Sequence, residues 1–270
     1  MVPSFPTSLI QFYLESTIMV VSTADSLKQI KQIKQKLADV EVVSFDLDDT
    51  LWPLESVLLA AEQTQYEWLE QHTPEITERF SAESLLEWRR QIIQTKPELR
   101  GDVTAMRTYS LMQLFDSFGY SNAKAKSLTD EVFQVFYHAR SQVTLFDGAM
   151  DCLVRLKQKY RLAAITNGNA DLEIAGVAHL FDDARFATLD SPAKPDAYMF
   201  RQTAQALGCD TNQILHVGDN PQTDVGGGQQ AGTLTAWYNP TGDSWPPDLE
   251  KPSIVLTNLE GLVCHLPRFA

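Results

Sequence analysis

Cysteine is scarce in this sequence and forms no motif. The 270 residues include three cysteines, Cys152, Cys209 and Cys264, which lie far apart and make no CxxC pair. Neither a disulfide framework nor a cysteine-based zinc site is therefore expected. This usage is typical of a reducing compartment, so the sequence predicts a cytoplasmic protein.

Long hydrophobic runs are also missing. The most apolar stretch near the start, residues 8–21, is too short to span a bilayer and contains Glu15. No basic residue precedes it, as a signal peptide would require. We therefore expect a soluble protein without membrane contact. Met19 is an alternative start, and residues 1–38 are expected to form an N-terminal extension with an amphipathic helix at 24–40.

Positive charge is in short supply. The chain has 22 lysines and arginines against 35 aspartates and glutamates, which gives a formal net charge of -13 and a pI near 4.8. This balance argues against a nucleic-acid-binding surface. An anionic substrate would have to be attracted by local positive charge. The length suits one large domain, or a domain with an insert.

What the sequence does contain is an alternation of short apolar strands and helices from residue 144 onward. A helix is expected at 196–208, closed by Gly208. Such alternation predicts a parallel sheet with right-handed crossovers. The run at 42–47 belongs to the same sheet. The later strands are expected at 161–166, 184–189, 213–218 and 234–238.

Residues 54–143 have a different character, because they carry only helical patterns. Four segments there have apolar residues three and four apart, punctuated by Pro74, Pro97 and Gly119. The block has the size of an α-helical bundle. We therefore expect a core formed by residues 39–53 and 144–270, with a helical domain at 54–143 inserted after its first strand.

Polar side chains follow four strands of the predicted sheet. Three of them, Asp46, Asp48 and Asp49, come directly after the first strand, where their like charges repel. The carboxyl ends of parallel strands meet at one edge, so the groups should converge. Carboxylates suit Mg²⁺, while a hydroxyl, an amide and a lysine suit a phosphoryl group. The later strands contribute Thr166, Asn167, Lys194, Asp219, Asn220 and Asp224.

Taken in order, these groups resemble the four motifs of the haloacid dehalogenase superfamily. The motifs are "DLDDT" at 46–50, Thr166, Lys194 and "GDNPQTD" at 218–224. The resemblance implies an α/β fold with a Rossmann-like core, an inserted helical cap and phosphomonoester hydrolysis. Only about 28 residues separate Thr166 from Lys194, too few for a second cap domain, which implies subfamily I.

The resemblance also implies a role for each motif residue. Asp46 would be the nucleophile that forms an aspartyl-phosphate, and Asp48 the general acid and base, which must hold its proton near neutral pH. The superfamily's dehalogenases lack this second aspartate, so a phosphoryl substrate is favoured. The phosphoryl oxygens would be held by Lys194, Thr166 and Asn167. Mg²⁺ would be held by the Asp46 side chain, the Asp48 carbonyl and Asp219, supported by Asp224 or Asn220.

Two further segments suggest a substrate. "AITNGNA" and "DVTAMR", with the first and last motifs, resemble a subfamily IA group of bacterial phosphatases acting on flavin mononucleotide or on the ribitylaminouracil phosphate intermediate of riboflavin synthesis. The sequence equally allows a phosphatase for phosphoglycolate, nucleotides or sugar phosphates, a related phosphomutase, and a non-catalytic binding or scaffold protein. The oligomeric state stays open.

Several nearby residues have two interpretations. Trp52 either lines the site or packs in the core, and Arg107 either reaches the substrate or is an ordinary surface arginine. Asp224 is either a support for the metal or a helix N-cap. Asp49 is expected to cap its turn, the glycines at 226–228 to allow close packing, and His216 to be a packed core residue.

Overall fold

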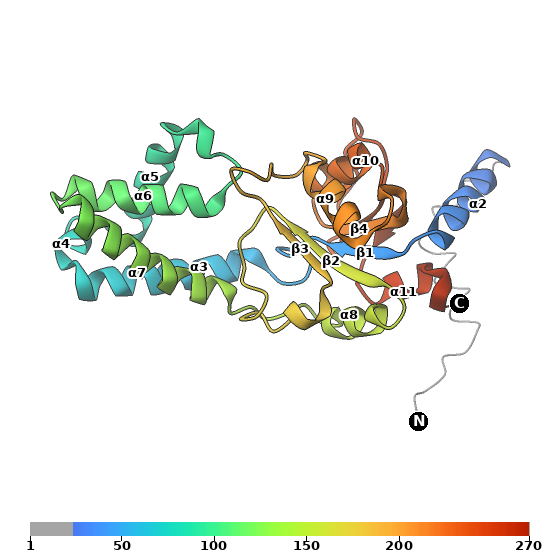
Figure 1. Cartoon of the computed structure of the whole chain (residues 1–270), viewed down its shortest axis with the longest axis horizontal. Coiled ribbons are helices and arrows are strands. Elements are labelled where there is room, and N and C mark those ends of the chain that lie inside the picture. The colour runs from blue at the N-terminus through green and yellow to red at the C-terminus, as the bar shows by residue number, and fades with distance from the viewer. Residues whose placement is uncertain (1–23, 270) are drawn as a thin grey trace, which may run out of the picture.

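The computed structural model describes residues 24–269 (Figure 1). The apolar stretch at 8–21 and Met19 lie outside these residues. Helix α2 (Ala24–Ala38) comes first and matches the amphipathic helix expected at 24–40. Its last turn places Leu37, which is 4% exposed, in the main hydrophobic core.

A six-stranded sheet forms the centre of the core. The strand order is β3-β2-β1-β4-β5-β6, and every neighbouring pair is parallel, which confirms the predicted fold class. The predicted strands are all present, although β3 begins one residue earlier and ends three residues sooner than expected. The sixth strand was not predicted, because a run of three apolar residues after Pro252 is too short to stand out. The strands are β1 (Val42–Phe45), β2 (Arg161–Thr166), β3 (Asp183–Phe186), β4 (Ile214–Gly218), β5 (Leu234–Tyr238) and β6 (Ile254–Leu256).

Helices cover both faces of this sheet (Figure 1). On one side lie α8 (Ala149–Lys157) and α11 (Gly261–His265), and on the other α9 (Tyr198–Leu207) and α10 (Gly227–Ala231). Successive residues of a strand point to opposite faces, so Val43 packs in the cluster with α8 while Val42 packs with Ala204 of α9. Gly208 ends α9 at φ +62°, as predicted.

The helical insertion follows β1 and extends away from the core (Figure 1). It has its own hydrophobic cluster, which includes Leu69, Leu111 and Phe115. One of the four helical segments predicted within 54–143 is interrupted, because Ser81 accepts a hydrogen bond from the Ser84 N–H and starts a new helix. We call this insertion the cap; its α-helices are α3 (Leu54–His72), α4 (Pro74–Thr77), α5 (Ala82–Gln94), α6 (Val103–Ser117) and α7 (Asn122–Ser141).

Short helical turns connect these elements. A π-helical turn, η4 (Pro221–Gly226), runs directly into α10, where the glycines at 226–228 allow close packing. A Cβ on Gly228 would lie 2.7 Å from the Thr233 hydroxyl oxygen. Within residues 24–269, no helix is long and apolar enough to cross a membrane. The 3₁₀ turns are η1 (Pro97–Leu99), η2 (Ala178–Leu180), η3 (Thr211–Gln213) and η5 (Pro267–Phe269).

Candidate active site

The first strand delivers its aspartates into a tight loop. The Asp46 N–H donates a hydrogen bond of 2.8 Å to the Val217 carbonyl of β4, and this bond fixes the start of the loop. Asp49 has φ +58°, and its side chain accepts a hydrogen bond from the Leu54 N–H. Asp49 therefore caps the turn into α3, as the sequence predicted.

A cavity of about 440 Å³ lies at the carboxyl ends of the strands, between the core and the cap. It brings together residues from four strand ends that are up to 178 positions apart in the sequence (46 to 224). The cap side is formed by Leu54, Leu58, Val103, Arg107, Phe136 and Arg140. The predicted site residues that line the cavity are Asp46, Asp48, Thr166, Asn167, Lys194, Asp219, Asn220, Asp224 and Arg107.

Lys194 is the central cation of this cavity. Its Nζ donates at 2.6 Å to Asp46 Oδ1, to Asp224 Oδ1 and to the Ile165 carbonyl. The residue is 4% exposed, so its charge is compensated by these partners rather than by water. Asn167 clamps the lysine backbone, because its Oδ1 accepts from the Lys194 N–H and its Nδ2 donates to the Lys194 carbonyl. The Asn167 amide therefore positions Lys194, and its contact with a phosphoryl group stays a prediction.

One lysine cannot neutralise two buried carboxylates, and the pKa values reflect this. Burial raises the pKa of Asp46 to about 8, an effect that Lys194 only partly offsets and Asp224 reinforces. Burial acts in the same direction on Asp224, but Lys194 and His216 outweigh it and hold the pKa of that carboxyl well below its usual range. Burial and the charge of Asp224 also raise the pKa of Asp219, to about 7. The negative charge that Asp46, Asp219 and Asp224 can carry therefore exceeds the positive charge of Lys194.

The arrangement of carboxylates fits a divalent cation. Asp46, Asp219 and Asp224 each offer one oxygen, and these atoms lie within 4.8 Å of one another. Oxygen ligands at such a site suit a hard cation, whose charge would oppose the burial and the repulsion by Asp224 that raise the pKa values of Asp46 and Asp219. Asp224 is no helix N-cap, because Asn220 accepts from the N–H groups of Gln222 and Thr223 and takes that role.

Asp48 is held by two donors. Its Oδ1 accepts from the indole N–H of Trp52 at 2.8 Å, and its Oδ2 accepts from Nη2 of Arg140 at 2.5 Å. Trp52 is fully buried in the main core and does not line the cavity, so of its two interpretations the structure favours the packed core residue. Its place four residues after Asp48 instead lets the indole reach back to that carboxylate.

Replacing Trp52 with phenylalanine should therefore impair catalysis more than folding. The ring volume is largely kept, while Asp48 loses one donor. A hydrogen bond to a charged group is worth about 1.5 kcal/mol, so we expect kcat to fall about 10-fold. Steady-state kinetics with a phosphomonoester checks this. Trp245→Phe is the control, because it loses an indole bond to the Leu249 carbonyl and should keep full activity.

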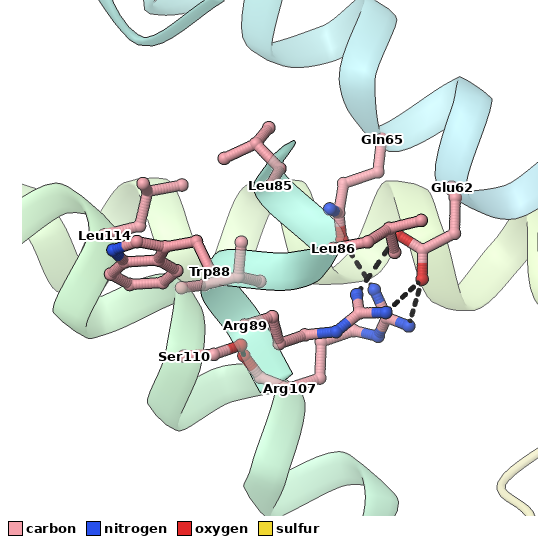
Figure 2. A pocket seen from close by; sticks show the side chains of 10 residues that line it. Glu62, Gln65, Leu85, Leu86, Trp88, Arg89, Arg107, Ser110 and Leu114 are labelled. Atoms are coloured by element: carbon pink, nitrogen blue, oxygen red, sulfur yellow. Dashed lines mark hydrogen bonds and ion pairs between the residues drawn. The ribbon is translucent and has the colours of Figure 1, made fainter. Parts of the chain in front are cut away.

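Arg107 is part of a buried network in the cap (Figure 2). Its guanidinium donates to Gln65 Oε1 at 3.0 Å and to Glu62 Oε1 at 2.7 Å, and Arg89 pairs with the same glutamate. It also lies over the Phe136 ring, 3.3 Å from the centroid. Burial and the neighbouring Arg89 lower its pKa to about 10, so it stays charged at neutral pH. An ordinary surface arginine is thus excluded, and Arg107 forms part of the cavity wall.

The remaining core residues of the site are fixed by local bonds. Thr166 is 1% exposed, and its hydroxyl oxygen accepts from the Gly168 N–H at 2.9 Å. His216 is fully buried between the Ser44 hydroxyl, 2.9 Å from its Nδ1, and Asp224. Burial lowers the His216 pKa. It is therefore a packed neighbour of the site, as expected.

Two residues that complete the site had no role predicted from the sequence. Arg140, the penultimate residue of α7, reaches Asp48 and also donates from Nε to Asn169 Oδ1 at 3.2 Å. Asn169 follows β2 within the "TNGN" segment, and its amide also donates to the Thr104 hydroxyl of α6. A basic residue in the last turn of a helix is ordinarily explained by the helix dipole, so the pattern held no signal for this contact.

The protein thus combines a parallel-sheet core, a polar cavity at the strand ends and a helical cap inserted after the first strand. This is the architecture that the four sequence motifs predicted. The model of the haloacid dehalogenase-like hydrolases matches residues 40–232. The chain therefore belongs to the haloacid dehalogenase-like hydrolases, as the motifs predicted. It is an enzyme of the phosphatase type in that family.

Individual relatives support this assignment. The chain is 32% identical over 204 residues to the 5-amino-6-(5-phospho-D-ribitylamino)uracil phosphatase YigB of Escherichia coli, covering 76% of this chain and 85% of that protein. A crystal structure described as a 2-haloacid dehalogenase from Pseudomonas syringae is 35% identical, with a TM-score of 0.79 over 86% of this chain and all of that one. The magnesium-bound hydrolase YfnB of Bacillus subtilis, 21% identical with a TM-score of 0.58 over 84% of this chain and 98% of that one, shares the fold.

Proposed function

We propose that this protein is a Mg²⁺-dependent phosphomonoesterase that works through an aspartyl-phosphate on Asp46. The observation that carries the proposal is the cluster of Asp46, Asp219 and Asp224 around Lys194, with Asp48 two residues beyond the nucleophile. Bound Mg²⁺ would be held by Asp46, the Asp48 carbonyl and Asp219, and would supply charge neutralisation for the phosphoryl oxygens.

In the first half of the reaction, Asp46 attacks phosphorus. The bond between phosphorus and the ester oxygen breaks, and Asp48 gives its proton to the departing alkoxide. Lys194 and Thr166, both at the cavity wall, bind the phosphoryl oxygens. Because Lys194 Nζ already lies 2.6 Å from Asp46, the phosphoryl group enters next to a fixed positive charge.

In the second half, water attacks the phosphorus of the aspartyl-phosphate. Asp48 takes one proton from that water, the bond to the Asp46 oxygen breaks, and inorganic phosphate leaves. The bond electrons return to the Asp46 carboxylate, so the enzyme is restored with a proton on Asp48. We propose that residues 54–143, acting as a cap domain on the core of 39–53 and 144–270, exclude bulk water during these steps.

For the substrate we propose a small phosphorylated metabolite with a polar heterocycle, such as ribitylaminouracil phosphate or flavin mononucleotide. The activity named for the Escherichia coli relative supports the choice. The cavity of about 440 Å³ is large enough for a ligand of this class. At its cap side, Arg107 offers charge over a Phe136 ring beside Leu58 and Val103, which suits a planar polar group.

The test is phosphate release from a panel of phosphomonoesters with Mg²⁺ and again with EDTA. We expect release to require the metal and to be at least about 10-fold faster from the riboflavin-pathway esters than from phosphoglycolate, nucleotides and sugar phosphates. Metal-dependent release with another preference would keep the chemistry and reject the substrate. No release from any ester would contradict the proposal as a whole.

A dehalogenase is the second candidate, because a similar crystal structure carries that description. A halide is a weak base and leaves without a proton, so dehalogenation has no use for an acid such as Asp48. Here that residue is held by two dedicated donors from Trp52 and Arg140. We therefore expect no halide release from 2-chloropropionate under conditions where phosphate is released.

The fate of the phosphoryl group distinguishes a phosphatase from a phosphomutase and from a scaffold. A mutase would return it from Asp46 to a sugar phosphate, whereas a phosphatase gives it to water. A non-catalytic scaffold would form no aspartyl-phosphate. Incubating the phosphorylated enzyme with buffer alone and then with sugar phosphates distinguishes them. The cytoplasmic location stays a prediction.

A further inference from the structure

We infer that Arg140 is a positioning residue through which the cap holds Asp48 as the base for hydrolysis of the aspartyl-phosphate. The inference rests on the proposed function, since it assigns a task to one side chain in that reaction. Its starting point is that Asp48 accepts a hydrogen bond on each oxygen, from Trp52 Nε1 and Arg140 Nη2. These two hydrogen bonds, one to each oxygen, fix the orientation of the Asp48 carboxyl group at the cavity wall.

Arg140 links the two parts of the protein at this point. It lies in the last turn of α7, where the cap returns to the core, and its side chain is 2% exposed. Nη2 contacts Asp48 of the core, while Nε donates to Asn169, which is held in turn by Thr104 of α6. The guanidinium is thus oriented by both the core and the cap.

Stability alone does not explain this arginine. Among the described residues, its Nη1 has no hydrogen-bond partner although it is buried. A buried donor without a partner costs free energy, as does the burial of the guanidinium itself. Such a cost is tolerated where a group has a task in the site, and Arg140 forms part of the cavity wall.

The ion pair of Arg140 and Asp48 packs directly against Gly168. A Cβ on Gly168 would overlap with Asp48 Oδ2, and it would lie 3.0 Å from Arg140 Nη2 and 3.3 Å from the Thr166 hydroxyl oxygen. The absence of a side chain at Gly168 therefore lets the pair sit directly against the β2 loop. Asp48 is held beside Thr166, which also lines the cavity that receives the phosphoryl group.

The chemistry of the second half-reaction then follows. Asp48 takes a proton from water as the water oxygen bonds to phosphorus, and the bond between phosphorus and Asp46 breaks with its electrons returning to Asp46. Arg140 exchanges no proton and only keeps the Asp48 oxygen in place. Without it, formation of the aspartyl-phosphate from an ester with a good leaving group should continue, while its hydrolysis should slow.

Arg140→Met with p-nitrophenyl phosphate tests this, because p-nitrophenolate leaves without a proton. We expect a burst of about one equivalent of p-nitrophenol, followed by a steady state in which kcat is about 30-fold lower and KM falls in step. Arg140→Lys should recover part of kcat. Arg155→Met, which alters an exposed arginine of α8, is the matched control and should show wild-type kinetics.

The outcomes distinguish failure of the positioning role from failure of the proposed function. If the wild-type enzyme releases neither p-nitrophenol nor phosphate from any ester of the panel, the proposed function fails. If the wild type is active but Arg140→Met shows no burst, or loses kcat/KM as strongly as kcat, the positioning role is wrong. Should Arg140→Met not fold by circular dichroism, Asn169→Ala removes the Nε acceptor and must show the same burst with a smaller fall in kcat.

Discussion

Replacing Asp46 with asparagine is expected to abolish turnover and leave the protein folded. The amide cannot form an acyl phosphate that water hydrolyses, so loss of the nucleophile should lower kcat by at least about 10³-fold. The protein should still fold, because the carbonyl oxygen of the new side-chain amide can accept a hydrogen bond from Lys194. Lys194 also keeps its hydrogen bonds to Asp224 and to the Ile165 carbonyl. Phosphate release and urea unfolding, measured on the same preparation, check both parts.

The change in the free energy of unfolding should stay within about 1 kcal/mol. The reason is that the native site holds two carboxylates for one lysine, and burial has already raised the pKa of Asp46 to about 8. Asp190→Asn, which alters an exposed aspartate, is the control and should be as active and as stable as the wild type. Full activity of Asp46→Asn would overturn the mechanism.

Replacing Lys194 with methionine should damage both folding and catalysis. Asp46 and Asp224 would be left as two buried carboxylates, and Lys194 is their shared partner at 2.6 Å. Removing one member of a buried ion pair costs about 3–5 kcal/mol, so the urea midpoint should fall strongly. Activity should be lost as well, because the cavity loses the cation that lies beside the nucleophile.

A second lysine provides the comparison. Lys157 pairs with Asp182 at 2.6 Å, but both side chains are about one third exposed, at 31% and 34%. Water screens such a pair, so Lys157→Met should cost less than about 1 kcal/mol and keep full activity. Equal losses of stability in the two variants would show that the Lys194 pairs are not the buried interactions described above.

Much of this molecule follows from local sequence patterns. The runs of apolar residues predicted five of the six strands, and turn residues such as Gly208 predicted where helices end. The convergence of Asp46, Lys194 and Asp219 could be predicted as well, since parallel strands end at one edge. Such rules work because alternation along a strand and the geometry of a parallel sheet depend little on which side chains surround them.

Other contacts depend on how separate segments meet. The sequence could not show that Trp52 turns into the core and bonds back to Asp48, because both the buried and the exposed orientation suit a loop tryptophan. The hydrogen bonds between the Asn167 amide and the Lys194 backbone could not be predicted for a similar reason, because they depend on the path of a distant loop.

Local sequence patterns were therefore sufficient to predict the parallel sheet, the position of the helical insertion and the set of polar groups at the strand ends. Which cap residues reach these polar groups depends instead on how the cap packs against the core. Arg107 and Arg140 are both arginines in cap helices with no distinguishing pattern, yet packing of the cap against the core places one over Phe136 and the other on Asp48. The physical reason is that local periodicity determines the face of a helix, whereas the partner of a long charged side chain is determined by the packing of whole elements.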